Sequence, residues 1–233
     1  MSTAIQVGNR VRIGGIAPPQ DPGASDALDA RDLFGLRLRR YRLALALWVA
    51  SIVMLFVGFS SAYVVRRGIP TYETTTGAYS AVWEPLRLPV GLLIVNTVIL
   101  IAASAAMEMA RRGCRADFER DAAETPAGNS RWMCILLTLL LGLGFLAGQG
   151  FVWIALRSDG HFMTTGARSA FFYVLTGTHA LHSVMGILAI TWVAIRYRKW
   201  QSDKRYMGVD LTAWYLHSMT VLWLYVFAFL IIA

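Results

Sequence analysis

The sequence contains five long blocks of apolar residues separated by polar segments. The blocks cover about residues 43–65, 87–110, 132–156, 170–195 and 212–233. Each is long enough to cross the ~30 Å of hydrocarbon in a bilayer, which takes roughly 20 helical residues. Because the backbone inside lipid must satisfy its own hydrogen bonds, each block is predicted to be a helix. The predicted fold class is therefore all-α, an integral membrane bundle of five transmembrane helices.

The segment before the first block has a different composition. Residues 14–25 read GGIAPPQDPGAS, and the first forty residues are polar and rich in Gly, Pro, Asp and Ala. They lack the short apolar core and small-residue cleavage site of a signal peptide. Such a composition favours disorder. We expect residues 1–40 to form a disordered cytoplasmic arm and residues 41–233 to form one transmembrane domain.

The distribution of basic residues predicts the orientation. The net charge of +8 comes largely from residues that the five spans place on one side of the membrane. These are Arg31, Arg37, Arg39, Arg40, Arg42, Arg111, Arg112, Arg115, Arg120, Arg131, Arg196, Arg198, Lys199, Lys204 and Arg205. Short cytoplasmic loops carry the excess of Lys and Arg, so the N-terminus is expected in the cytoplasm and the C-terminus in the periplasm. The charge therefore indicates topology and contact with anionic lipid headgroups, and no nucleic-acid partner is expected.

A few polar residues lie within the apolar blocks. His179, His182 and Gly186 fall on one stripe of the fourth predicted helix, and His182 lies close to mid-membrane. Gln149 and His217 are the corresponding polar residues of the third and fifth blocks. A stripe of polar and small residues is expected to face another helix rather than lipid.

Carboxylates are nearly absent from the blocks. Glu108 and Asp210 lie near the ends of the second and fifth blocks, and neither is deep. Ion-coupled transporters and proton pumps usually keep charged groups near mid-membrane. The sequence therefore argues against an ion-coupled transporter.

The histidines admit four interpretations. Haem ligation by His182 and His217 requires both nitrogens at one iron, whereas these residues are expected at different depths. A three-histidine copper site meets the same difficulty, and a proton relay would lack a carboxylate partner. The favoured interpretation is structural, with no catalytic, cofactor-binding or metal residue. In it, Gln149, His179, His182, Gly186 and His217 form interhelical polar and packing contacts.

Several stretches resemble one known family. Residues 171–186, FFYVLTGTHALHSVMG, are similar to the fourth-helix signature of subunit III of the haem–copper oxidases, which include cytochrome c and quinol oxidases. Residues 51–63 (SIVMLFVGFSSAY), 142–149 (GLGFLAGQ) and 215–223 (YLHSMTVLW) resemble other helices of that subunit. The resemblance extends over all five predicted spans and matches the bacterial five-helix form.

The resemblance implies an accessory subunit of a proton-translocating terminal oxidase in the bacterial inner membrane. Such a subunit has no redox centre of its own, and haem and copper are expected in the partner subunit I. Subunit II receives the electrons. Subunit III packs beside subunit I, holds membrane phospholipids in a cleft between its first two helices and the rest, and supports proton uptake in aerobic respiration.

The sequence departs from the family pattern at several positions. Gln149 and Ile52 stand where the family commonly carries acids, and Thr220 replaces the aspartate of the closing helix. Leu216 replaces the tryptophan that usually precedes the histidine at 217. Roles of the missing carboxylates therefore do not transfer, because an amide such as Gln149 bonds but does not titrate. The alternatives are a subunit III-like accessory protein of a nitric oxide reductase, a stand-alone membrane cytochrome b, and a small-molecule transporter.

Overall fold

The computed structural model describes residues 22–69, 71–73, 78–80, 89–120, 129–160 and 166–232. Within these residues the chain forms five helices: α1 (Pro22–Gly68), α2 (Val90–Glu119), α3 (Asn129–Ser158), α4 (Ala167–Arg196) and α5 (Ser202–Ile232). Two short antiparallel strands, β1 (Thr71–Glu73) and β2 (Ala78–Ser80), follow α1. All five helices are long and apolar enough to cross a membrane. The predicted fold class, an all-α membrane protein with five spans, is confirmed, whereas the cytoplasmic orientation of the N-terminus stays a prediction.

The helices extend beyond the apolar blocks from which they were predicted. The fifth helix begins at Ser202 rather than near residue 212, because it includes the polar residues that precede the apolar block. Helix α1 begins at Pro22, within the segment expected to be a disordered arm. Residues 1–39 and 40–233 form separate compact units, and the expected arm lies partly outside the described residues.

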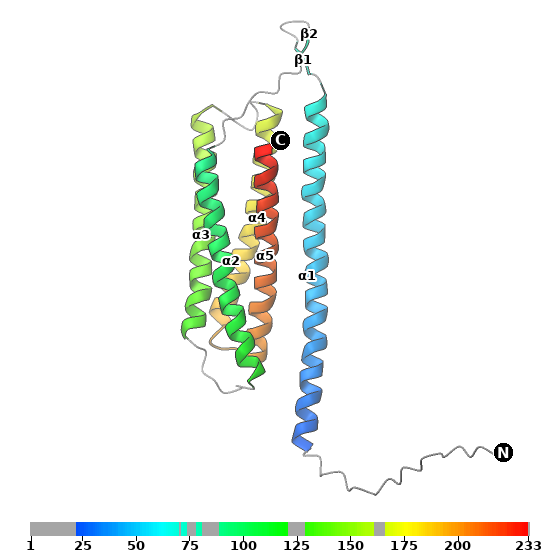
Figure 1. Cartoon of the computed structure of the whole chain (residues 1–233), viewed down its shortest axis with the longest axis vertical. Coiled ribbons are helices and arrows are strands. Elements are labelled where there is room, and N and C mark those ends of the chain that lie inside the picture. Colours follow the sequence, from blue (N-terminus) through cyan, green and yellow to red (C-terminus); the bar gives the residue numbers. More distant parts are fainter. Residues whose placement is uncertain are drawn as a thin grey trace, which may run out of the picture. The chain divides into compact units, whose positions relative to one another are not determined.

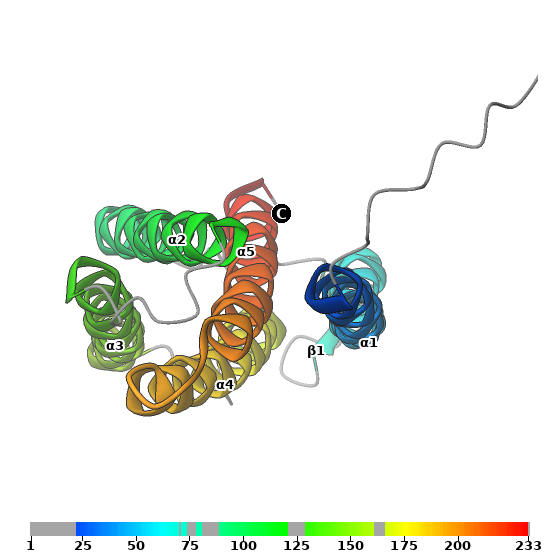
Figure 2. The ribbon, with the colours of Figure 1, turned by 90° about the horizontal axis from the view of Figure 1, so that it is seen from below.

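Helices α2 to α5 form a ring in which each helix packs against two neighbours. Close contacts join α2 to α3, α3 to α4, α4 to α5 and α5 back to α2 (Figure 2). Consecutive helices of the ring run in opposite directions, so α3 and α5 end where α4 begins, at the same end of the ring (Figure 1). The core of this ring contains Leu93, Phe145, Phe172 and Trp223, each at most 1% exposed.

Hydroxyl side chains inside the spans bond back to their own helices. The hydroxyl group donates to the carbonyl four residues earlier in Ser60, Thr97, Thr138, Thr176, Ser183, Thr191, Thr212 and Thr220. This arrangement satisfies a polar group where no water is available. Each hydroxyl donor is therefore satisfied within its own helix.

Helix α1 joins the ring through its side chains. No Cα atom of α1 lies within 8 Å of a Cα atom of α2 to α5 among the described residues. Instead, Phe56 packs edge-on against a ring on α4, and Tyr63 does so against Phe171 of α4 and Phe229 of α5. The large side chains thus bridge a wide spacing between α1 and its neighbours.

Candidate functional site

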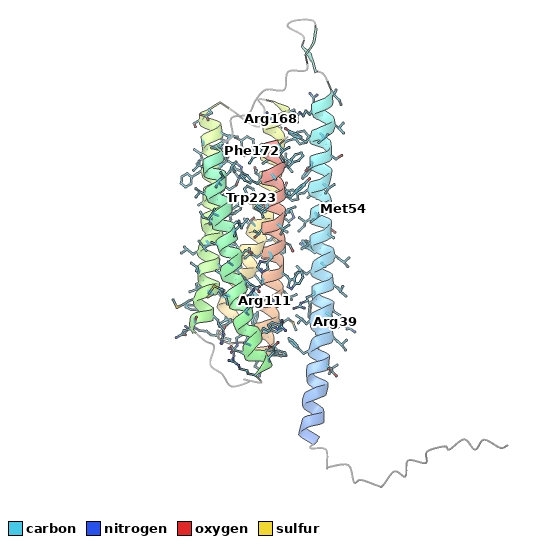
Figure 3. The ribbon with its side chains drawn as sticks, in the orientation of Figure 1. Arg39, Met54, Arg111, Arg168, Phe172 and Trp223 are labelled. Carbon is cyan, nitrogen blue, oxygen red and sulfur yellow. The ribbon has the colours of Figure 1, made fainter. Side chains whose placement is uncertain are left out.

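Asp210 is a fully buried carboxylate held by two arginines from other helices. Arg42 of α1 donates two hydrogen bonds to it, from Nε to Oδ2 at 2.9 Å and from Nη2 to Oδ1 at 2.8 Å. Arg111 of α2 donates a third, longer bond at 3.4 Å. Asp210 itself is on α5 and has no exposed surface. This two-pronged geometry is the strongest form of arginine–carboxylate contact. It connects three helices at the end of the bundle where Figure 3 labels Arg111.

Glu108 extends this network along α2. It accepts two bonds of 2.7 Å from Arg111 and one of 2.8 Å from Arg112. His217 of α5 lies between the two helices, with Nε2 3.3 Å from Glu108 Oε2 and Nδ1 2.5 Å from Ser104 Oγ. We call Arg42, Ser104, Glu108, Arg111, Arg112, Asp210 and His217 the Asp210 cluster.

The partners of His217 bear on its chemistry. Both of its ring nitrogens have polar neighbours on α2, which leaves neither free for iron. The haem-ligand interpretation therefore does not fit the geometry at this residue. Elsewhere in the described ranges, no group of three or more His, Cys, Asp or Glu residues is arranged to hold a metal ion.

The imidazole of His179 lies in an aromatic enclosure. Its ring is fully buried, and neither nitrogen has a partner among the described residues. The ring centroids of Phe56, Phe145 and Trp223 lie 6.5, 5.7 and 5.0 Å away, so rings from α1, α3 and α5 surround it. His179 therefore contacts the neighbouring helices through aromatic rings.

His182 and Gly186 lie where α4 meets α5. Nδ1 of His182 lies 2.8 Å from the carbonyl of Thr178 in its own helix, while the carbonyl of His182 accepts a 2.9 Å bond from the Tyr215 hydroxyl. The ring of Tyr215 covers Gly186, and a Cβ at that position would lie 3.2 Å from the tyrosine ring. The absence of a side chain at Gly186 therefore allows Tyr215 to approach α4.

Gln149 faces α2 at a second close approach of helices. Its Oε1 accepts a long bond of 3.5 Å from Asn96 Nδ2, and both amides are buried. Asn96 occupies the space that a side chain at Gly148 would fill. Gln149 Nε2 and Asn96 Oδ1 have no partner in the described part of the chain. The pair is thus an incompletely satisfied interhelical contact.

Tryptophan N–H groups supply interhelical bonds that the sequence analysis did not identify. Trp223 of α5 donates to Thr97 of α2 at 3.0 Å, and Trp153 of α3 donates to Thr176 of α4 at 3.1 Å. A buried tryptophan usually finds an acceptor for its N–H group. The threonines that accept were visible as polar residues in the spans, but their pairing depends on helix rotation, which the sequence does not specify.

Tyr197, which directly follows α4 in the sequence, carries a further buried polar group. The Tyr197 side chain has no exposed surface, and its hydroxyl lies 3.7 Å from Cys114 Sγ of α2. Burial raises the pKa of the Tyr197 phenol above its ordinary value. The phenol is therefore neutral at physiological pH and acts as a hydrogen-bonding group between helices.

Comparison with known proteins places most of the chain in one group. The model of the family described as cytochrome c oxidase subunit III matches residues 36–232. The chain is 29% identical to a probable cytochrome c oxidase subunit 3 of Nocardia farcinica, over 78% of this chain and 82% of that protein. It is 31% identical to cytochrome c oxidase subunit 3 of Synechocystis, over 82% of this chain and 73% of that protein. The match to the subunit of Pylaiella littoralis, at 27% identity, covers 80% of this chain but only 64% of that protein.

Replacing His179 by leucine tests its aromatic environment. Because the substitution removes two buried nitrogens that have no partner, we expect the free energy of unfolding to stay the same or rise by about 1 kcal/mol. Replacing His217 by leucine removes two polar contacts, and we expect a loss of about 1–2 kcal/mol. Both values are measurable by unfolding the purified protein from mild detergent. An equal loss in both variants would show that His179 has a hydrogen-bond partner in the native protein.

Proposed function

Because the chain belongs to the cytochrome c oxidase subunit III family, we propose that it serves as subunit III of a haem–copper terminal oxidase in a bacterial inner membrane. As a member of that family it is a multi-pass membrane protein and an accessory subunit that assembles with other oxidase subunits. The observation that carries this conclusion is the family match over residues 36–232, which includes all of α2 to α5.

The finer part of the proposal concerns what the subunit does in the complex. We infer that it packs beside subunit I, which would hold the haems and copper, with subunit II as the second partner. It stabilises subunit I, retains membrane phospholipid and supports proton uptake. Gln149, His179, His182, Gly186 and His217 would serve as interhelical polar and packing residues in this scaffold. Their contacts with neighbouring helices support a structural role.

His182 is the residue that we propose to contact the partner subunit. Its Nδ1 is engaged within α4, and no hydrogen bond to Nε2 exists among the described residues. The side chain is only partly buried. The ring lies against Phe56 of α1, with the two ring centroids 6.2 Å apart. A polar nitrogen without a partner inside a membrane is costly, and intramembrane polar groups usually find one. A donor or acceptor on a helix of subunit I would satisfy Nε2 and fix the register between the two subunits.

Co-purification tests the proposed function directly. The tagged chain, isolated in mild detergent from its native membrane, should retain an oxidase subunit I with a haem absorption spectrum. Mass spectrometry of the retained proteins identifies the companions. Recovery of a nitric oxide reductase without any oxidase subunit I would overturn the oxidase assignment.

The variant His182→Phe tests the proposed subunit contact. Membrane interhelical hydrogen bonds contribute on the order of 0.6 kcal/mol, up to ~1.7, so we expect subunit retention to fall by a factor of roughly three to twenty. The active life of the complex should shorten, while initial turnover per haem stays near normal. The matched variant Thr191→Val, which removes a hydroxyl bonded only within α4, should leave retention unchanged. An immediate collapse of turnover in an intact complex would instead indicate that His182 takes part in the chemistry.

A further inference from the structure

We propose that Asn96 of α2 and Gln149 of α3 bind one water molecule between the two helices. The two amides share a single long bond of 3.5 Å, from Asn96 Nδ2 to Gln149 Oε1. Asn96 Oδ1 and Gln149 Nε2 have no partner among the described residues, and the two side chains are only 2% and 1% exposed. Bulk solvent is therefore out of reach, and a bound molecule is needed to complete their hydrogen bonds. The site involves α2 and α3 alone and is independent of the proposed function.

The two unpartnered atoms are chemically complementary. Gln149 Nε2 is a donor and Asn96 Oδ1 is an acceptor. A water molecule accepts a bond from the first and donates a bond to the second, so one bound molecule satisfies both. Exchanging the oxygen and nitrogen positions of both amides again leaves one donor and one acceptor without a partner. The need for a bridging water is therefore the same in either orientation of the amides.

The position of Asn96 explains why the amides do not form a second bond with each other. Its Oδ1 lies in the space that a side chain at Gly148 would occupy, 2.2 Å from where a Cβ would be. Oδ1 is thus directed at the α3 backbone, while Nδ2 of the same amide contacts the side chain of Gln149. The one bond that forms is longer than the usual ~2.7–3.2 Å. Long polar contacts of this kind are often completed by a bridging water.

His179, whose ring nitrogens also lack partners in the described part of the chain, offers no comparable site. Aromatic rings of Phe56, Phe145 and Trp223 surround it, and the Trp223 N–H group already donates to Thr97. Internal waters typically make about three hydrogen bonds, and apolar enclosures stay dry. The amide pair, by contrast, supplies two polar side chains from two helices. It is therefore the better place for a bound water in the ring of α2 to α5.

The water-bridged pair would fix the register between α2 and α3. Helix α3 contains four glycines, Gly142, Gly144, Gly148 and Gly150. Small residues permit close helix approach, so several registers would be compatible with the packing alone. Sliding α2 by one turn would move the amides about 5.4 Å apart and break both the direct bond and the water bridge. Because unpartnered polar groups inside a membrane are costly, the pair selects one register.

Radiolytic footprinting tests for the water. An X-ray pulse converts bound water into hydroxyl radicals, which oxidise the side chains in contact with it even where bulk solvent does not reach. Phe145 lies one turn from Gln149 on the same face of α3 and is 1% exposed. Phe172 of α4, with no exposed surface, is the matched reference. The full chain is purified in mild detergent with its retained subunits and irradiated in heavy-oxygen water. We expect Phe145 to take up the heavy oxygen several-fold faster than Phe172.

Three variants assign the signal to the amide pair. Gln149→Leu should lower the labelling of Phe145 to the level of Phe172, because the water loses the donor that holds it. Asn96→Leu should do the same from the opposite helix. Thr138→Val removes a buried hydroxyl that donates within α3, and it should leave the labelling unchanged. If either single leucine variant fails to fold, the double variant, which removes both amides, should show the same loss.

The wild-type protein alone can contradict the site. Equal labelling of Phe145 and Phe172 would overturn it. Labelling of Phe145 that persists in Gln149→Leu and Asn96→Leu would place the water elsewhere, such as beside His179, whose ring centroid is 5.7 Å from that of Phe145, and would also overturn it. Labelling that requires both amides and survives Thr138→Val would uphold the site, whichever subunits are retained with the chain.

Discussion

The structure depends on how one buried negative charge is neutralised. Asp210 has no exposed surface, and a lone carboxylate in such surroundings would be severely destabilising. Asp210 is neutralised by hydrogen bonds from Arg42 of α1 and Arg111 of α2. Because Arg111 also holds Glu108, and Glu108 contacts His217, the requirement at Asp210 fixes the relative rotation of α1, α2 and α5 at one end of the bundle.

The ring and α1 are held together by different physical means. Helices α2 to α5 approach closely where small residues permit, as at Gly148 beneath Asn96 and Gly186 beneath Tyr215, and buried tryptophans bond across the ring. Helix α1 relies on an ion pair at Arg42 and on aromatic contacts of Phe56 and Tyr63. The first arrangement gives a packed scaffold, and the second holds α1 at a wider spacing from the ring. Both suit a subunit that supports a catalytic partner.

The sequence was sufficient for the helices but not for their side-chain partners. Five apolar blocks predict five spans because hydrocarbon leaves the backbone no other solution. The polar residues were also identifiable, and His217 and Gln149 do face other helices. The environment of His179 was not predictable, since three aromatic rings from separate helices create it. Asp210 looked peripheral because it stands at the edge of an apolar block, and its burial becomes visible only when α1 and α2 are placed beside it.

A double-mutant cycle on Arg42 and Asp210 tests this account most directly. The free energy of unfolding is measured in mild detergent for Arg42→Gln, Asp210→Asn, the double variant and the wild type. Residues in direct contact typically show interaction energies of 0.5–3 kcal/mol. Since Arg42 is 37% exposed and partly screened, we expect a favourable coupling of about 1–2 kcal/mol. The double variant should therefore lose less stability than the sum of the losses in the two single variants. Strictly additive effects would show that α1 is not held to the bundle by this ion pair and would contradict the account.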